Sequence, residues 1–236
     1  MSLDRVSLKL IELALWEDLG PGDATSRLTV PKDAIGRAQA RARQSLVLSG
    51  LKAFRATFRL VDPTVKVRLL AQDGDLLSPG DPAAEVSGSA RSLLAAERVA
   101  LNFLMRLSGV ATLTSQYVKA LGGGPNPPQL LDTRKTTPGL RALEKAAVAH
   151  GGGHNHRFGL FDGILIKDNH LAAAGSVAEA VAQAKAGAAH GLKVEVEVDR
   201  LDQAQAALEA GADALLLDNM TLDELKEAVA LAERLG

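Results

Sequence analysis

The 236-residue chain contains no cysteine, which excludes several kinds of site at once. Disulfide frameworks, zinc ribbons, iron–sulfur clusters and thiol nucleophiles all depend on cysteine side chains. Aromatic residues make up only 3% of the chain, with one Trp and one Tyr. So few rings argue against a stacking surface for single-stranded nucleic acid.

The chain also lacks an excess of charge of either sign, since 27 Lys and Arg residues stand against 28 Asp and Glu residues. A net charge of −1 provides no broad basic field for DNA or for an acidic membrane. No apolar run approaches the roughly 20 residues of a membrane span. The N-terminal segment mixes charged and apolar residues, unlike a signal peptide. We therefore expect a globular protein located in the cytoplasm.

The first half of the chain mixes helical and alternating patterns. We expect helices over 3–16, 51–60, 90–107 and from there to about 121, and strands over 37–43 and 65–69. Ser108-Gly109 is expected to interrupt the long helical region. Strands that alternate polar and apolar residues predict an α+β domain with one solvated sheet face.

Beyond the Gly- and Pro-rich loop at 122–128, short apolar strands alternate with helices. We expect strands over 129–132, 163–167, 193–198 and 214–218, and helices over 139–149, 176–188, 202–210 and 221–235. This alternation predicts parallel strands in either a doubly wound sheet or a barrel. Every predicted strand ends in charged residues, which favours a barrel with its site at the carboxyl ends of the strands.

Four strands cannot close a barrel. The apolar strand at 214–218 would then be an exposed edge, so we expect that another chain covers it or that the native protein is longer. The fold expected is an α/β sandwich-like N-terminal domain followed by an incomplete, open α/β barrel. We place the first domain at 1–108, where subunits would meet, and the catalytic barrel at 109–236.

Two segments gather cations near predicted strand ends. Residues 132–137 (DTRKTT) lead into a helix that starts with proline, where backbone N–H groups, hydroxyls and two cations could bind an anion. The glycine run 151–153 precedes His156 and Arg157, and it suits a backbone that bends tightly or approaches a ligand. A solvated helix start and a flexible surface loop are the alternatives.

Lys167 ends a predicted strand and could form a Schiff base, bind an anion or simply cap the strand. Glu195 and Glu197 share one strand face, where Lys167 of the neighbouring strand could pair with them. Glu197 and Asp218 could hold hydrated Mg²⁺ or a sugar hydroxyl, although an internal salt bridge fits the spacing equally well. These residues suit a polyanionic small molecule together with Mg²⁺.

Several longer motifs are spread over nearly the whole chain: EDLGPGD at 17–23, ERVALN at 97–102, DTRKTTPGLR at 132–141, GGGHNHR at 151–157, IKDNH at 166–170 and VEVEV at 194–198. Together they resemble the quinolinate phosphoribosyltransferase family. The resemblance implies transfer of phosphoribosyl from phosphoribosyl pyrophosphate to quinolinate with loss of CO₂, giving nicotinate mononucleotide and pyrophosphate for NAD synthesis. It also implies Mg²⁺ and a homodimer or dimer-built hexamer with shared active sites.

The resemblance implies which residues bind the quinolinate carboxylates. Arg134, Arg157 and His156 would hold them, with Thr133 beside these three side chains. Arg98 would reach in from the partner subunit, whereas its position on an apolar helix by itself indicates an ordinary surface arginine.

The resemblance also implies a catalytic set. Lys135 and Lys167 would meet the carboxylates or phosphates of the substrates. Glu197 and Asp218 would face the ribose and its Mg²⁺, directly or through water, and stabilise positive charge at the anomeric carbon.

The resemblance has one departure and two alternatives. The family continues past the helix at 221–235 with more strands and a Gly-rich phosphate loop, so we expect a missing tail of about fifty residues, as the open barrel suggests.

A related phosphoribosyltransferase-like protein associated with molybdenum transport, acting on another acceptor, is one alternative. A non-catalytic quinolinate-binding protein is the other.

Overall fold

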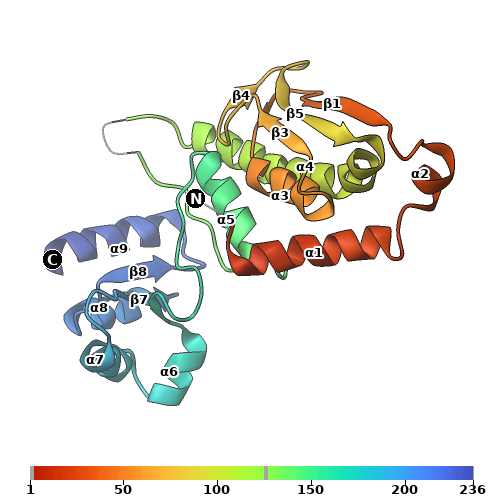
Figure 1. The fold of residues 1–236 in the computed structure, drawn as a ribbon. Helices are drawn as coiled ribbons and strands as arrows, with labels where there is room; N and C mark the ends of the chain where they lie inside the picture. The colour runs from red at the N-terminus through yellow and green to blue at the C-terminus, as the bar shows by residue number, and fades with distance from the viewer. Residues whose placement is uncertain (1–2, 125–126, 236) are drawn as a thin grey trace. The chain divides into compact units, whose positions relative to one another are not determined.

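The computed structural model describes residues 3–124 and 127–235, and Pro125 and Asn126 of the predicted loop lie outside this range. The chain forms two compact units, Met1–His156 and Arg157–Gly236. Figure 1 traces the elements of both units in chain order. No helix within the described ranges is long and apolar enough to cross a membrane.

The first unit begins with two helices, α1 (Arg5–Leu19) and α2 (Ala24–Thr29). Asp4 caps α1 by accepting from the backbone N–H groups of Val6 and Ser7, at 2.9 and 3.0 Å. The predicted helix over 3–16 is thus confirmed and extends three residues further, to the break at Gly20. The short helix α2 was not predicted, because six residues carry too little periodicity to be recognised.

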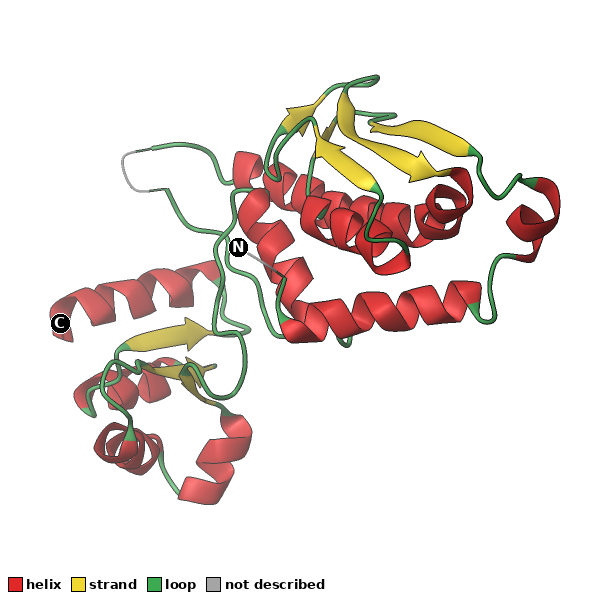
Figure 2. Ribbon diagram, in the orientation of Figure 1, coloured by secondary structure: helices red, strands yellow, loops and turns green. Residues whose placement is uncertain are grey.

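A three-stranded antiparallel sheet in the order β1-β5-β3 covers two helices of this unit (Figure 2). Its strands are β1 (Ile35–Arg41), β3 (Lys66–Leu69) and β5 (Pro82–Ser89), and β2 (Leu46–Val47) pairs separately with β4 (Leu76–Leu77). The inner face packs on α3 (Leu51–Val61) and α4 (Ala90–Ala120), and the shared core includes Phe54, Phe58, Val86, Leu93 and Ala100.

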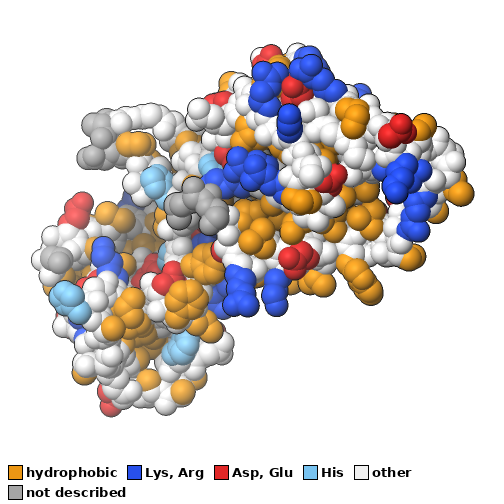
Figure 3. Space-filling view, in the orientation of Figure 1, with side chains coloured by type: hydrophobic (Ala, Val, Ile, Leu, Met, Phe, Trp, Pro, Cys, Tyr) orange, Lys and Arg blue, Asp and Glu red, His pale blue; other side chains and the backbone are white. Residues whose placement is uncertain are grey.

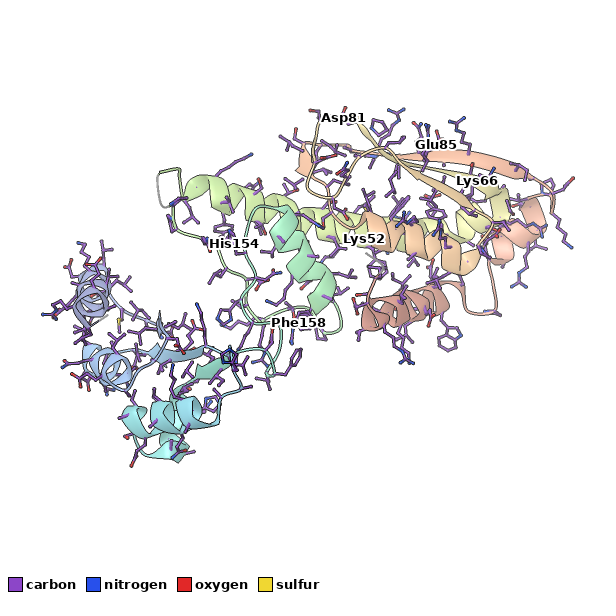
Figure 4. The ribbon with its side chains drawn as sticks, turned by 60° about the vertical axis from the view of Figure 1, so that its left-hand side comes forward. Lys52, Lys66, Asp81, Glu85, His154 and Phe158 are labelled. Carbon is purple, nitrogen blue, oxygen red and sulfur yellow. The ribbon has the colours of Figure 1, made fainter. Side chains whose placement is uncertain are left out.

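The opposite sheet face is polar, as the alternating pattern predicts. Arg37 of β1 and Arg68 of β3 both form ion pairs with Glu85 of the central strand. Glu85 and Lys66 are labelled on this sheet in Figure 4. The predicted α+β domain with one solvated sheet face is therefore confirmed.

The expected interruption at Ser108-Gly109 is wrong, because α4 runs without a break from Ala90 to Ala120. Ser108 is buried, and its Oγ accepts from the backbone N–H of Ser49 at 3.0 Å and donates to the carbonyl of Ser49 at 3.1 Å. Tertiary hydrogen bonds occupy the hydroxyl that could have competed with the helix backbone. The predicted domain limit at 108/109 falls inside this helix.

The last helix of the first unit is α5 (Arg141–His150), which confirms the helix expected over 139–149. The strand expected over 129–132 is wrong, since this segment makes only an isolated parallel bridge between Leu131 and His154. Figure 4 labels His154 on the segment that follows α5. The bridge joins the chain before α5 to the chain after it. It therefore brings the start of residues 132–137 next to the segment that carries His156.

The second unit is a parallel sheet in the order β6-β7-β8 with helices on it. Its strands are β6 (Ile164–Ile166), β7 (Val194–Val198) and β8 (Ala214–Leu217), and its helices are α6 (Asp168–Ala174), α7 (Val177–Gly187), α8 (Leu201–Glu209) and α9 (Leu222–Leu235). The strands expected from 163 onward are confirmed as a parallel set, and the seven-residue α6 was missed.

The central strand β7 has one apolar face and one acidic face. Val194, Val196 and Val198 are at most 1% exposed and pack with residues of α7, α8 and α9. Glu195 and Glu197 are half-buried on the other face, as their shared parity predicts. Among the described strands, β8 pairs only with β7 and forms the apolar edge that the sequence indicates.

Candidate active site

A buried ion pair holds together the two cation-bearing segments of the first unit. Lys145 Nζ of α5 donates to Asp132 Oδ1 and, at 2.9 Å, to the carbonyl of His156. The same Asp132 Oδ1 accepts from the backbone N–H of His156 at 2.9 Å. The side chains of Lys145 and Asp132 are only 3% and 7% exposed. The structure therefore brings residues 133–135 and His156, all predicted site residues, to one buried anchor.

Asn155 completes this anchor. With its amide nitrogen turned toward the neighbouring acceptors, it donates to Asp132 Oδ2 at 2.7 Å and to the carbonyl of Lys145 at 3.0 Å. Both oxygens of the Asp132 carboxylate then have partners, as a buried charge requires.

The predicted role of hydroxyls and N–H groups at a Pro-started helix needs correction, because α5 begins only at Arg141. The Thr137 N–H and hydroxyl donate to Glu144, at 3.0 and 2.8 Å, so they are engaged within the protein. The Thr136 hydroxyl accepts from Arg141 at 3.2 Å. The Thr133 hydroxyl accepts from the N–H of Lys135 at 3.0 Å, which leaves its own hydrogen able to donate.

Arg134 and Lys135, within residues 132–137, carry positive charges that no described side chain neutralises. Arg134 is half-buried, and its Nε is buried without a hydrogen-bond partner in the described parts of the chain. Lys135 is exposed, and its ammonium group likewise makes no ion pair within those residues. A buried unpaired guanidinium nitrogen is costly unless a ligand or water pairs with it. The segment is therefore suited to bind an anion through these two side chains.

The glycine run has a packing reason rather than a demonstrated ligand. A Cβ on Gly151 would lie 2.4 Å from the carbonyl oxygen of Ala111, and one on Gly153 would lie 2.9 Å from Thr114 Cγ2. Gly152 has a φ of +87°, which favours glycine. The run lets the segment after α5 bend sharply against α4, so of the two predicted reasons the tight bend is confirmed.

In the second unit, Arg157 lies along Gly163. Its Nη1 donates to the carbonyl of Gly163 at 3.0 Å, and a Cβ at Gly163 would lie 3.1 Å from Arg157 Cβ. Asp162 accepts from the backbone N–H groups of Phe158 and Gly159, both at 2.7 Å, and closes the loop between these residues. The glycine therefore leaves space in which the arginine side chain lies.

Lys167 and Glu197 form the ion pair that their neighbouring strands predict. Parallel pairing places Ile166 opposite Val196, so both side chains stand one residue beyond a paired position. The next strand brings Asp218 to the same end of the sheet, where its backbone N–H donates to the carbonyl of Val198 at 2.9 Å. Asp218 is exposed and accepts from Asn219 at 2.9 Å. These three predicted residues gather at the carboxyl ends of the strands.

The acidic groups of this unit do not form a complete metal cage. Within residues 3–124 and 127–235, no group of three or more His, Asp or Glu side chains is placed to hold a metal ion. Mg²⁺ commonly keeps several waters and uses one or two carboxylates together with substrate phosphates. Glu197 and Asp218 supply oxygen donors of that kind, although Lys167 engages the Glu197 carboxylate.

Arg98 is exposed on α4 and makes no side-chain hydrogen bond or ion pair with any described residue. A second arginine of the same helix, Arg106, is instead engaged, since it donates to Glu144 Oε1 at 2.8 Å and to the Thr137 hydroxyl at 2.9 Å. Burial raises the pKa of Glu144, but the hydrogen bonds from Arg106 and Thr137 outweigh it and hold this pKa below its usual range.

Sequence reasoning missed Asp132, Glu144 and Lys145 as determinants of the site. Glu144 and Lys145 stand beside the buried Leu143 in α5, and both are themselves buried, at 7% and 2% exposed. Adjacent charges within the apolar side of a predicted helix were the available signal.

Comparison with known proteins places both halves of the chain in one family. The family model described as "Quinolinate phosphoribosyl transferase, N-terminal domain" matches residues 23–108, and the corresponding C-terminal domain matches 110–236. A probable nicotinate-nucleotide pyrophosphorylase [carboxylating] of Bacillus subtilis is 43% identical over 94% of this chain and 76% of that protein. A chloroplastic enzyme of the same name from Arabidopsis thaliana is 40% identical over 90% of this chain and 63% of its own length.

Solved structures agree. A NadC from Streptococcus pyogenes superposes with a TM-score of 0.92 at 43% identity, covering 100% of this chain and 83% of that one. The nicotinate-nucleotide pyrophosphorylase of Francisella tularensis gives the same TM-score at 37% identity, over 99% of this chain and 82% of that one. The chain belongs to the quinolinate phosphoribosyltransferase family, the decarboxylating pentosyltransferases of de novo NAD biosynthesis.

Proposed function

We propose that Arg134, Arg157 and His156 bind the two carboxylates of quinolinate, with Thr133 donating its hydroxyl hydrogen beside them. The observation that carries this assignment is the uncompensated charge of Arg134, whose Nε is buried without a partner in the described chain. Arginine is suited to carboxylates, because its planar head can donate two parallel hydrogen bonds. Lys135, the next residue, supplies a second cation for a carboxylate or a phosphate.

Lys167, Glu197 and Asp218 act on the phosphoribosyl group in this proposal. Carboxylates at the ends of neighbouring strands can stabilise the positive charge that develops at the anomeric carbon when pyrophosphate departs. The support is their position at the carboxyl ends of β6, β7 and β8, where parallel α/β folds carry their chemistry. Lys167, already paired with Glu197, orients that carboxylate and presents a cation to the substrate anions.

The bond changes follow from the two substrates. The ring nitrogen of quinolinate forms a bond to the anomeric carbon, and the carbon–oxygen bond to pyrophosphate breaks. The bond from C2 to its carboxylate then breaks with release of CO₂, and its electron pair stays on C2 until a proton is taken up. The quaternised ring nitrogen and nearby cations stabilise that electron pair, so no covalent enzyme intermediate is needed.

In this scheme Mg²⁺ would bind together with the diphosphate group of phosphoribosyl pyrophosphate. When bound, it neutralises negative charge on the leaving pyrophosphate. Glu197 and Asp218 would contact it directly or through water, a donor set that suits a metal arriving with its substrate.

We further propose that the chain forms a homodimer, or a hexamer built from dimers, in which Arg98 acts in the partner's site. Arg98 is exposed and has no described side-chain partner. Large apolar side chains are exposed on α1 and α4, among them Trp16 at 76% and Met105 at 56%. Hydrophobic side chains are also visible on the face of the first unit in Figure 3. Such exposure supports a subunit interface on the first domain, which we propose spans residues 1–108. The catalytic domain would then span residues 109–236.

We propose a cytoplasmic location as well. Fractionation of the source cells should recover the activity in the cytosolic fraction, and activity confined to membranes or organelles would contradict this.

One assay tests the proposed reaction. Purified protein is mixed with quinolinate, phosphoribosyl pyrophosphate and Mg²⁺, and nicotinate mononucleotide and CO₂ are followed by mass spectrometry. We expect both products in equal amounts, and no mononucleotide when nicotinate replaces quinolinate. Mononucleotide formed equally well from nicotinate would contradict the decarboxylating assignment, and Arg134→Ala, tested alongside, would contradict the carboxylate assignment if its affinity for quinolinate were unchanged.

A further inference from the structure

Helix α5 carries two buried side chains of opposite charge at adjacent positions. Glu144 is 7% exposed and Lys145 is 2% exposed. Neighbouring helical residues point about 100° apart, so these two charges face different partners rather than each other. Neither residue belongs to the set of side chains proposed to touch the substrates.

The two charges are attached to opposite ends of one short segment. Lys145 holds the first end through its ion pair with Asp132. Glu144 holds the last end, where it accepts from the backbone N–H of Thr137 at 3.0 Å and from the Thr137 hydroxyl at 2.8 Å. Arg106 of α4 donates to both Glu144 and Thr137 and closes this second attachment. The residues between the two ends include Arg134 and Lys135.

Stability alone is a weak reason for such an arrangement. Taking charges out of water is costly, and replacing a buried ion pair by apolar residues of similar volume is often neutral or stabilising. What an apolar pair cannot supply is a directional bond to a particular oxygen or N–H group at each end of the segment. Fixed ends restrict the backbone that carries the two cations, which lowers the ordering cost when an anion binds.

We propose that Glu144 and Lys145 are positioning residues that clamp both ends of residues 132–137 and thereby present Arg134 and Lys135 to the substrate anions. The proposal rests on the proposed function of those two cations. It predicts that removing either attachment, the one by Glu144 or the one by Lys145, weakens substrate binding even though Arg134 and Lys135 remain. The effect should fall on quinolinate affinity, because Arg134 is proposed to contact the quinolinate carboxylates.

The test compares Lys145→Met and Glu144→Gln with the unaltered chain, using calorimetric titration with quinolinate and separate kcat and KM values for each substrate. We expect Lys145→Met to weaken quinolinate binding about tenfold or more, equivalent to about 1.4 kcal/mol. Glu144→Gln should have a smaller effect in the same direction, because an amide oxygen can still accept from Thr137. Lys145→Arg should restore part of the affinity, and hydrogen exchange at residues 133–136 should quicken in Lys145→Met.

Two further variants separate the possible outcomes. Lys185→Met removes another Lys–Asp ion pair, with Asp213 at 2.9 Å, and should leave quinolinate affinity unchanged. Arg134→Ala tests the proposed function itself. If Arg134→Ala binds quinolinate normally, the assignment of the cations fails. If Arg134→Ala is weakened while folded Glu144→Gln and Lys145→Met both retain full affinity, the clamp is overturned and Glu144 and Lys145 are only structural. If Lys145→Met does not fold, full affinity in folded Glu144→Gln overturns the clamp.

Discussion

Lys167 and Glu197 form an ion pair across the neighbouring parallel strands β6 and β7, with side chains 38% and 19% exposed. The face of β7 that carries Glu197 lies opposite its buried valines, so this charge is not inside the apolar core. A pair that is partly open to solvent contributes modestly to stability. Its value lies in fixing a carboxylate and an ammonium group at the end of the sheet where Asp218 also lies.

This pair should matter more for turnover than for folding. We expect Lys167→Met to lower kcat about 100-fold, the usual scale for losing one electrostatic contact in a transition state, with little change in melting temperature. The double variant Lys167→Met with Glu197→Gln should be no more active than either single variant. Recovery of activity in the double variant would mean that Lys167 serves only to neutralise Glu197.

Arg157 should be required for quinolinate binding. Arg157→Ala leaves a substrate carboxylate without its charged partner, and we expect affinity to fall about tenfold or more. Gly163→Ala provides a gentler test, because the added Cβ would lie 3.1 Å from Arg157 Cβ and displace the side chain. Titration with quinolinate should show a smaller loss for Gly163→Ala. Full affinity in Arg157→Ala would remove this residue from the binding set.

Arg98 should act on the partner's site. Arg98→Ala and Lys135→Ala should each be inactive alone, because each removes one cation from every site. Mixed oligomers of the two variants should recover part of the activity, since some sites then combine an intact Arg98 with an intact Lys135. The measurement is specific activity after subunit exchange, with mixing verified by mass spectrometry. Verified mixed oligomers without activity would contradict sharing between subunits.

Glu144 should make stability depend on pH. Its folded-state pKa lies below the usual value, so the stabilisation is present above the unfolded pKa and is lost as the pH falls through the folded pKa. Glu144→Gln should therefore melt below the unaltered chain at neutral pH. The difference in melting temperature should shrink in acid. A difference that is constant with pH would show that ionisation of Glu144 does not contribute.

Two glycines should respond to alanine in opposite ways. Gly151→Ala should destabilise the protein by about 1–3 kcal/mol, because the new Cβ would overlap α4. Gly109 lies in α4 with open space around it, so Gly109→Ala should stabilise by about 0.5–1 kcal/mol through the helix backbone. Urea unfolding of both variants measures the two effects. Equal changes in the same direction would contradict the packing reason given for residues 151–153.

Much of the candidate site can be read from neighbouring residues in the sequence. The parity of Glu195 and Glu197 and the position of Lys167 at a strand end were sufficient to predict a shared face and an ion pair. The spaced motifs were sufficient to indicate the family, which the comparisons confirm. These features depend on local periodicity or on short motifs, and both can be recognised from the sequence alone.

The sequence alone therefore determined the family, the parallel strands from residue 163 onward and the charges at their ends. Only the tertiary structure decided that α4 is continuous, that residues 129–132 make a single bridge, and that Lys145 and Glu144 hold both ends of residues 132–137. The physical reason is that these outcomes depend on contacts between distant residues, such as Ser108 with Ser49. Packing and buried hydrogen bonds of this kind override local propensity and leave little trace in the sequence pattern.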